Sequence, residues 1–447
     1  MHKVEKDCLV DLFKTITDKY EYVVLRNADE LPYDNFSNDV DILIDHDRYD
    51  LFEKKMKSIF LKHGFKRMER TSFFGIECYT FYNIENEKAY SLKIDLFFNI
   101  EGGGVKYYDF KEVITYKKKN TNGIYVFESN VEAYVTALKT FAAGGVLKEK
   151  YLSFFIENRL ESEHSLYQKC PSKSLKQCID FLIGNHKNPN SVSRRKIVTE
   201  TWWSNFKTNP LKAVMSVLQH YMTEVSRMFK KQYMIVLVGP DGSGKTTMIE
   251  RLQKDSKETL RSIPERIHMF HHRPHLFPNI SDIFKKNISE EELTERTFSP
   301  HSGKESNKIV SFIKLLYYAM DYRLGYIIKV MPLQRKNKFI VFDRYFFDFI
   351  VDQKRSALKI SDKIALGIYN VIIPKPNKVL FIKADPLAAH NRKKELPEEV
   401  IKQINDSYDK MANRYDYFKI IVNDDLEAAY SNFTKSFIET LTERVDG

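Results

Sequence analysis

The chain has 447 residues, of which 43% are hydrophobic and 13% aromatic, so it can fill the cores of about two or three domains and is not a disordered protein. Its net charge of +11 suits anionic ligands such as nucleotides, nucleic acid or an acidic membrane surface, although the lysines are scattered as on solvated faces. The four cysteines form no C-x-x-C pair, the N-terminus has no apolar signal core and no run reaches membrane-spanning length. We therefore exclude disulfide-stapled and membrane-spanning classes and expect a soluble, cytoplasmic protein with free thiols.

Residues 1–160 are predicted to form an α+β domain. We expect helices at 4–20 and 49–63, and strands at 22–26, 39–45, 65–71, 76–84 and 92–98. The two-residue period of a strand places Asp39 and Asp41 on one face, and a later strand carries Asp95. Three such carboxylates can hold divalent metal ions that align a nucleoside triphosphate. The alternative is that they are exposed acids at strand ends, since a D-x-D pattern alone is a weak signal.

The region from about residue 20 to 155 resembles the nucleotidyltransferase superfamily with the polymerase-β-like fold, especially its uncharacterised bacterial members. The resemblance implies that Asp39, Asp41 and Asp95 are metal ligands. Members often carry a glycine pair or Gly-Ser before the first two acids. Here Leu25-Arg26-Asn27 stands in that region, and Arg26 could take over contacts with a triphosphate.

Residues 161–230 are predicted to be a helical connector, with helices at 174–183 and 211–229 and a loop at 184–191. The second helix has apolar residues at helical spacing and a basic end. It could make peripheral membrane contact as a basic amphipathic helix. Packing against a neighbouring domain is the commoner role of such a helix.

The third part, residues 231–447, begins with a strand at 234–238 followed by a G-x-x-x-x-G-K-[ST] phosphate loop. Glycines let backbone N–H groups surround phosphate oxygens, the lysine contacts the β- and γ-phosphates, and the threonine hydroxyl binds Mg²⁺. The helix that starts at Lys245 points its N-terminal dipole at the same anion. The predicted ATP-binding residues are Gly239, Gly242, Ser243, Gly244, Lys245, Thr246 and Thr247.

Further strands are predicted at 267–270, 339–345, 378–383 and 419–423, and helices at 309–331 and 426–445. Their alternation indicates a doubly wound parallel sheet with ligands at the carboxyl ends of its strands. Asp343 ends one strand as the second Mg²⁺ residue, and Arg344 beside it can neutralise a phosphoryl group. Arg392, on a basic helix, could close over the triphosphate as a lid, or belong to a solvated face. The polar segment 277–307 is expected to be a mobile substrate loop.

This half, over about residues 232–442, closely resembles the thymidylate kinase family of P-loop kinases. The resemblance implies that Asp241 contacts a sugar hydroxyl of the acceptor and that Arg344 contacts its phosphate, and we add Arg273 and Tyr345 as acceptor-binding residues. Where that family has an Arg-Glu-Pro-Gly segment, this chain has Arg273-Pro274-His275 flanked by histidines. We therefore expect an acceptor other than thymidylate.

The sequence as a whole predicts an ATP-dependent phosphotransferase that uses Mg²⁺ and acts on a small nucleotide or sugar. Its predicted catalytic residues are Asp241, Lys245, Asp343, Arg344 and Arg392. The fused front domain suggests a bifunctional enzyme that activates a sugar or nucleotide for bacterial surface polysaccharide synthesis, and we expect a homo-oligomer. The alternatives are a nucleic-acid-associated or defence NTPase, or a kinase whose idle front domain only holds a substrate or partner. Nucleic acid is the less expected partner, because no basic stripe has interleaved aromatics.

Overall fold

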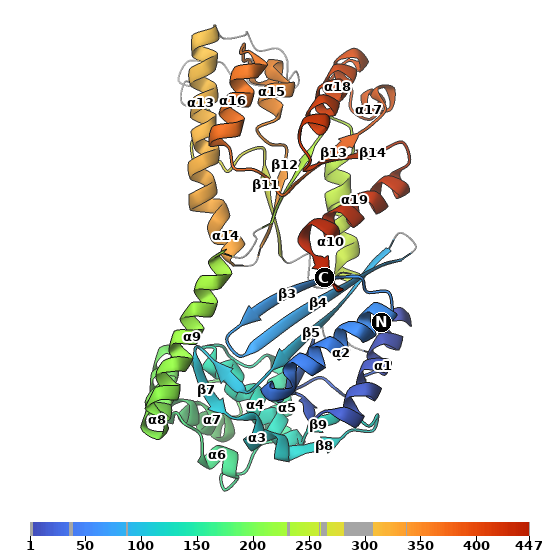
Figure 1. The fold of residues 1–447 in the computed structure, drawn as a ribbon. Coiled ribbons are helices and arrows are strands. Elements are labelled where there is room, and N and C mark those ends of the chain that lie inside the picture. Colours follow the sequence, from blue (N-terminus) through green and yellow to red (C-terminus); the bar gives the residue numbers. More distant parts are fainter. Residues whose placement is uncertain are drawn as a thin grey trace. The chain divides into compact units, whose positions relative to one another are not determined.

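The computed structural model describes residues 3–34, 39–85, 88–229, 233–258, 260, 266–280, 307–336 and 338–446 (Figure 1). The chain forms two compact units. The first contains Met1–Asn83, Tyr90–Lys230 and Glu443–Gly447, and the second contains Ile84–Ala89 and Lys231–Thr442. The helices of the predicted connector, 161–230, lie within the first unit, and the last five residues return to it.

A mixed sheet of eight strands is the centre of the first unit, in the order β15-β3-β4-β5-β2-β1-β9-β8. Strand β2 pairs antiparallel with β1 and parallel with β5, and the short β15 pairs antiparallel with the edge strand β3. The strands are β1 (Tyr22–Val24), β2 (Val40–Ile44), β3 (Arg67–Phe73), β4 (Ile76–Glu85), β5 (Lys88–Phe97), β8 (Lys117–Lys119), β9 (Tyr125–Phe127) and β15 (Glu443–Arg444), with β6 (Ile100–Gly102) and β7 (Val105–Tyr108) forming a separate hairpin.

The two faces of this sheet carry different cores. Val40 and Ile42 of β2 and Ile94 of β5 pack with helices α1 (Lys3–Lys19) and α2 (Tyr49–Lys62). Because side chains alternate along a strand, Asp41 and Asp95 face the other way, toward the side covered by α4 (Ser129–Ala142). The sequence pattern thus already separated the acids from the apolar face.

The second core of the first unit joins α4 to the helices that follow it, and so the predicted connector is an integral part of this fold. These helices are α5 (Glu149–Glu157), α6 (Ser165–Gln168), α7 (Lys173–Asn185), α8 (Arg194–Thr208) and α9 (Pro210–Phe229), and the short α3 (Phe110–Val113) precedes them. Leu175, Ile179 and Leu182 bury the apolar stripe of α7 there. Much of α9 is not covered in this way, since Leu211, Met215 and Met222 are exposed.

The second unit is built on a five-stranded parallel sheet in the order β11-β12-β10-β13-β14. Its strands are β10 (Met234–Val238), β11 (Ile267–His271), β12 (Phe339–Asp343), β13 (Lys378–Lys383) and β14 (Phe418–Val422). The central strand β10 is buried throughout, as its continuous apolar run predicts for a sheet covered on both faces. The predicted parallel α/β fold of this half is confirmed.

Helices cover both faces of this sheet (Figure 1). Met234, Val236 and Val238 of β10 share a core with α13 (Lys308–Gly325), α16 (Asp362–Ile372) and α18 (Glu398–Arg414). Helices α10 (Lys245–Glu258) and α19 (Leu426–Leu441) contribute none of the described residues of this core. A π-helical turn, Tyr326–Val330, links α13 to α14 (Met331–Arg335), so the helix predicted over 309–331 is interrupted. The remaining helices in the described part of this unit are α15 (Asp348–Val351), the 3-10 turn η6 (Gln353–Ser356) and α17 (Pro386–Arg392).

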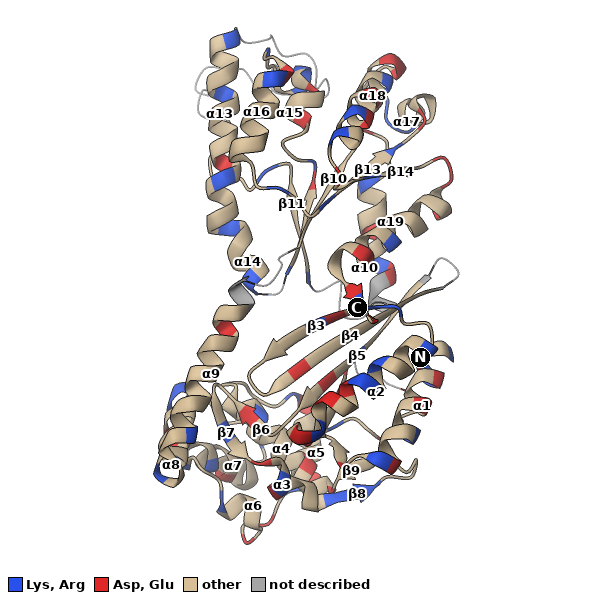
Figure 2. Cartoon of the chain, in the orientation of Figure 1, with Lys and Arg blue, Asp and Glu red and all other residues tan. Residues whose placement is uncertain are grey.

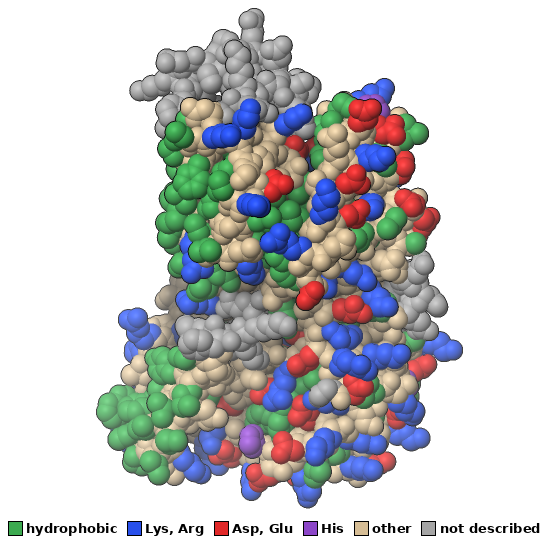
Figure 3. Space-filling model, turned by 45° about the horizontal axis from the view of Figure 1, so that its top comes forward, with side chains coloured by type: hydrophobic (Ala, Val, Ile, Leu, Met, Phe, Trp, Pro, Cys, Tyr) green, Lys and Arg blue, Asp and Glu red, His purple; other side chains and the backbone are tan. Residues whose placement is uncertain are grey.

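Two further expectations concern the predicted substrate loop and membrane-spanning helices. Most of the predicted substrate loop, residues 281–306, lies outside the described residues. Among the helices that are described, none is long and apolar enough to cross a membrane. Figure 3 shows apolar side chains gathered over α13, where Ile309 and Ile313 are largely exposed.

Candidate functional site

The phosphate loop follows the carboxyl end of the central strand β10, where its glycines are required by close packing. Gly239 has a φ of +145°, and a Cβ there would lie 2.4 Å from the carbonyl oxygen of Ile382. Gly242 has a φ of +80°, and its Cβ would lie 2.4 Å from the carbonyl oxygen of Ala389 on α17. A side chain at either position would push β13 or α17 away, so these glycines shape the loop as well as freeing its backbone N–H groups.

Lys245 is folded back into its own loop. Its ammonium is buried and donates hydrogen bonds to the carbonyl oxygens of Gly239 at 2.8 Å and Pro240 at 2.9 Å. Burial, with repulsion from Arg344, lowers the pKa of Lys245 to about 8. The side-chain amide of Asn423 donates to the carbonyl of Ser243 at 2.8 Å and ties the loop to the end of β14. A phosphate would give this ammonium a stronger partner than the neutral carbonyls.

Asp343 ends β12 beside the loop, because β12 pairs with β10 so that Asp343 lies opposite Leu237. Its Oδ2 lies 3.2 Å from Nδ1 of His271, while its buried Oδ1 has no hydrogen-bond partner. Burial raises the pKa of Asp343, but His271 and Lys245 outweigh this effect and lower it. The unpartnered oxygen and the exposed hydroxyl residue Thr246 at the start of α10 are oxygen donors of the kind that fit Mg²⁺.

Arg344 has a φ of +70°, in the left-handed region, and two carboxylates bind its side chain. Its guanidinium donates to Asp241 of the phosphate loop and, at 2.7 Å, to Asp348 on α15. A second guanidinium, that of Arg355 on η6, donates to the other oxygen of Asp241 at 2.5 Å. Burial alone would raise the pKa of Asp241, but Arg344, Arg355 and Lys245 lower it.

These groups enclose a small cavity beside the phosphate loop. Its free volume is about 10 Å³, room for about one water, so a larger acceptor must displace Arg355 or its neighbours. Sequence reasoning missed Arg355, Asp348 and Tyr408, a residue of α18 whose hydroxyl donates to Asp348 at 2.5 Å. Asp348 stands four residues after Arg344, a spacing that could have revealed it, whereas Arg355 and Tyr408 carry no comparable signal.

Two predicted acceptor-binding residues, Arg273 and Tyr345, are buried and have partners within the protein. Arg273 is 2% exposed and donates at 2.6 Å to Asp321 of α13, so it anchors the loop after β11. Tyr345 is 1% exposed, and its hydroxyl donates to the carbonyl of Pro374 at 2.7 Å within the apolar core. Arg392 does lie at the loop, where its Nη1 donates to the carbonyl of Gly242 at 3.4 Å.

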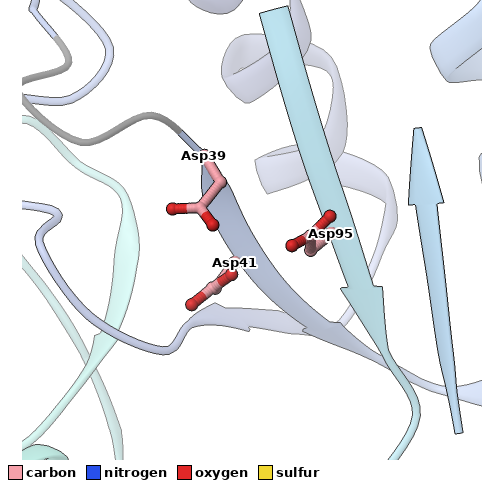
Figure 4. A group of neighbouring side chains, drawn as sticks. All are labelled: Asp39, Asp41 and Asp95. Carbon is pink, nitrogen blue, oxygen red and sulfur yellow. The ribbon is translucent and has the colours of Figure 1, made fainter. Parts of the chain in front are cut away.

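The first unit brings its three predicted metal-site acids together (Figure 4). One carboxylate oxygen from each of Asp39, Asp41 and Asp95 lies within 4.8 Å of the others. The parallel pairing of β2 with β5 sets Asp41 directly opposite Asp95, which explains the convergence. Asp95 is buried, and its Oδ1 has no hydrogen-bond partner.

Three basic side chains surround this cluster. Nζ of Lys93 lies 2.7 Å from Asp95 and 3.3 Å from Asp39, and Nε of Arg26 donates to Asp41 at 2.7 Å. Arg26 is thus bound to the cluster itself. Burial lowers the pKa of Lys139 on α4 to about 8, although Asp41 opposes the shift. Lys93 and Lys139 had no sequence signal, apart from the two-residue spacing that places Lys93 on the face of Asp95.

Comparisons with known proteins support the prediction of a P-loop domain in the second half of the chain. A family model described as the KAP family P-loop domain matches residues 199–443, more than half of the chain. A crystal structure of thymidylate kinase from Ehrlichia chaffeensis is 15% identical over 46% of this chain and 98% of that chain, with a TM-score of 0.31. No curated protein matches the chain. The assignment of a P-loop domain therefore rests on the family match and on the five-stranded parallel sheet, and not on the thymidylate kinase structure.

Proposed function

Because the chain belongs to the KAP family of P-loop domains, we propose that its second unit binds ATP with Mg²⁺ and transfers the γ-phosphoryl group to a small acceptor. The observation that carries this proposal is the cluster of Asp241, Arg344 and Arg355 next to Lys245. A hydrolysing domain can also place an arginine on the γ-phosphate. Here both guanidiniums are bound to Asp241 of the loop, and this arrangement suits a carboxylate that receives an acceptor hydroxyl.

The chain's own residues would act by position and charge. Lys245 would leave its backbone carbonyls for the β- and γ-phosphates, and Thr246 and Asp343 would hold Mg²⁺, which neutralises phosphate charge when bound. Arg392 would close over the phosphates from α17. Arg344, held by Asp348, would keep its orientation while Asp241 exchanges Arg355 for a hydroxyl of the acceptor.

The acceptor class follows from this exchange. Asp241 offers a hydrogen-bond acceptor for a hydroxyl, and the released Arg355 offers a guanidinium for an anionic group a short distance away. A sugar phosphate or nucleotide has both groups. Histidines flanking Arg273 stand where thymidylate kinases carry their Arg-Glu-Pro-Gly segment, and so we do not expect thymidylate to be the acceptor.

The test is a mass-spectrometric screen of ATP with pools of nucleotides, sugars and sugar phosphates. Wild type should phosphorylate a phosphorylated or polyhydroxylated compound, Lys245→Ala should lose turnover by about 10³-fold or more, and Arg355→Gln should mainly raise the acceptor KM. Lys354→Gln, in the same turn, is the matched control. ADP formation that needs no acceptor and is indifferent to Arg355→Gln would instead favour an NTPase, the second class that the family match allows.

The acid cluster of the first unit favours a second candidate function, metal-dependent nucleotidyl transfer. Its support is the convergence of Asp39, Asp41 and Asp95 and the unpartnered oxygen of Asp95. Two of these carboxylates on one strand and a third opposite them suit ions that orient a triphosphate. A product of this unit could then be the substrate, or the product, of the kinase unit, as in activation of a surface sugar.

Labelled nucleoside triphosphates test this second function. Wild type with Mg²⁺ or Mn²⁺ should release pyrophosphate in the presence of the correct acceptor, and Asp41→Asn with Asp95→Asn should abolish the release while ATP-dependent kinase turnover continues. If the double variant changes neither pyrophosphate release nor Mn²⁺ binding, the front unit only holds a substrate or partner.

A further inference from the structure

A cavity that the functional site does not use lies in the first unit, between α8, α9 and the strand β7. Its volume is about 780 Å³, within the range of small-molecule sites in proteins. Gly103, in the turn before β7, approaches α8 so closely that a Cβ would lie 2.9 Å from Val198, so one wall is tightly built. The apolar lining includes Val105, Val198, Trp202, Val214, Val217 and Leu218.

The charged residues that line this cavity are all basic. Arg194 and Arg195 line it together with the apolar residues, and no acidic residue is among its described lining. Neither guanidinium forms an ion pair with a described carboxylate. Both belong to the first turn of α8, which carries no acid, so the helix dipole adds to the positive potential there. Figure 2 shows basic residues on α8.

The lining of this cavity combines apolar walls with two guanidiniums that have no ion-pair partner among the described carboxylates. A ligand that covers the apolar walls is stabilised by about 25 cal/mol for each Å² of apolar surface removed from water. An anion between the two guanidiniums also offsets their mutual repulsion. A ligand that satisfies both has a flexible apolar tail and an anionic head. A polar nucleotide would leave the walls uncovered, and a neutral oil would leave the arginines without a partner.

We propose that this cavity binds a single-tailed amphiphilic anion, with its carboxylate or phosphate head on Arg194 and Arg195 and its tail along Val198, Trp202 and Leu218. The site is independent of the phosphate loop and of the acid cluster. We infer a monomeric ligand rather than a bilayer surface, because the cavity is concave and the cations line it beside the apolar walls. Exposed Met215 and Met222 on α9 are outside its lining.

Tryptophan fluorescence can report binding of this ligand. Trp202 lines the cavity, and Trp202 and Trp203 are the only tryptophans of the protein. Myristate, myristyl phosphate and myristyl alcohol share one tail and differ in head group, so they separate the two parts of the site. Binding of each is measured by tryptophan emission and by calorimetry on the full chain, below the concentration at which micelles form.

We expect one myristate or myristyl phosphate per chain, and binding of the alcohol weaker by about tenfold or more. Arg194→Gln with Arg195→Gln should weaken the two anions by about tenfold and leave the alcohol within about twofold, while Lys207→Gln on the same helix changes nothing. Val198→Phe fills the cavity and should weaken all three ligands. Met215→Phe, the same kind of change outside the lining, should not.

Three results would overturn the proposal. One is equal affinity for anion and alcohol. Another is an equal loss in Met215→Phe and Val198→Phe when both variants keep the wild-type circular dichroism and melting temperature. The third is binding only to vesicles of phosphatidylglycerol and phosphatidylcholine and to none of the free amphiphiles, which would make α9 a membrane-surface helix.

Discussion

The lysine of the phosphate loop is buried, and its burial has a measurable consequence for proton binding. Its pKa of about 8 lies below the ordinary 10.5, because burial disfavours the charged form. Between about pH 8 and 10 the folded protein therefore binds fewer protons at Lys245 than the unfolded chain does, and the free energy of unfolding rises with pH in that window. Well below pH 8, Lys245 is protonated in both the folded and the unfolded chain, so it no longer makes the free energy of unfolding depend on pH.

Triphosphate binding should reverse this shift. The bound anion restores the charged form, so ATP should bind at pH 8.5 with uptake of up to roughly three quarters of a proton, and at pH 7 with almost none. Calorimetry in buffers of different ionisation enthalpy measures this number. Lys245→Met should bind more weakly and take up no proton at Lys245. Equal uptake by wild type and variant would assign the proton to another group.

Individual residues also show where sequence reasoning stops. The two-residue period placed Asp39 and Asp41 on one face, and the structure brings Asp95 to them because parallel pairing sets it opposite Asp41. Arg273 and Tyr345 were chosen by type and nearness to a motif, but both are buried in packing roles. Arg355 reaches Asp241 from 114 residues away in sequence, a contact that no local pattern encodes.

At the scale of an element, β5 places an ammonium among the acids it carries. Lys93 and Asp95 share one face, and Lys93 bridges Asp95 and Asp39. Burial disfavours its charge, but the two carboxylates outweigh this effect and raise the pKa of Lys93. The lysine therefore remains charged and competes with a divalent ion for the same oxygens.

Lys93→Met should raise the affinity of the first unit for Mn²⁺ by about tenfold, since a competing charge is removed. Electron paramagnetic resonance of free Mn²⁺ gives the affinity directly. Lys57→Met, a change on α2 away from the acids, is the control. An affinity that falls in Lys93→Met would mean that the ammonium assists the ion or its ligand.

The helix α13 is fastened to the loop after β11 by a buried ion pair. Asp321 accepts from Arg273 at 2.6 Å and from the backbone N–H groups of Leu276 and Phe277. Asp321→Ala should lower the free energy of unfolding of the second unit by about 3–5 kcal/mol, because it leaves a buried guanidinium unpaired. Urea unfolding followed by circular dichroism reports it, as both tryptophans lie in the first unit.

The double change Arg273→Met with Asp321→Leu is the partner experiment. It removes both charges, and so most of the lost stability should return. A double variant no more stable than Asp321→Ala would mean that the backbone hydrogen bonds of Leu276 and Phe277 carry the effect.

For the whole molecule, element order was readable from the sequence and the assembly of the units was not. Alternating strands and helices with a phosphate loop predicted the parallel sheet, because each signal is local. The return of residues 443–447 to the first unit has no such signal. A helix was predicted through 445, whereas α19 ends at Leu441 and β15 pairs with β3, placing Val445 in the core of α1 and α2.

Val445→Ala should thus destabilise the first unit, although it lies at the far end of the chain. The side chain of Val445 is 3% exposed, and its backbone N–H donates to the carbonyl oxygen of Lys66 at 3.1 Å. The loss should be about 1–3 kcal/mol, seen in the tryptophan emission of the first unit. Val146→Ala, at a 55% exposed position between α4 and α5 of the same unit, should cost under about 0.5 kcal/mol. Equal effects of the two would contradict the pairing.

The strand β15 also decides how this protein can be divided in the laboratory. A single cut between residues 230 and 231 leaves the front fragment without the strand that covers one end of β3. The back fragment then carries a donor strand with no acceptor. An open sheet edge is a template for pairing with another chain, so the front fragment alone should aggregate or swap strands. Co-expressed fragments, or a peptide of residues 443–447 fused after residue 230, should restore a monodisperse species, and a truncation series that ignores the last five residues will misreport which half is folded.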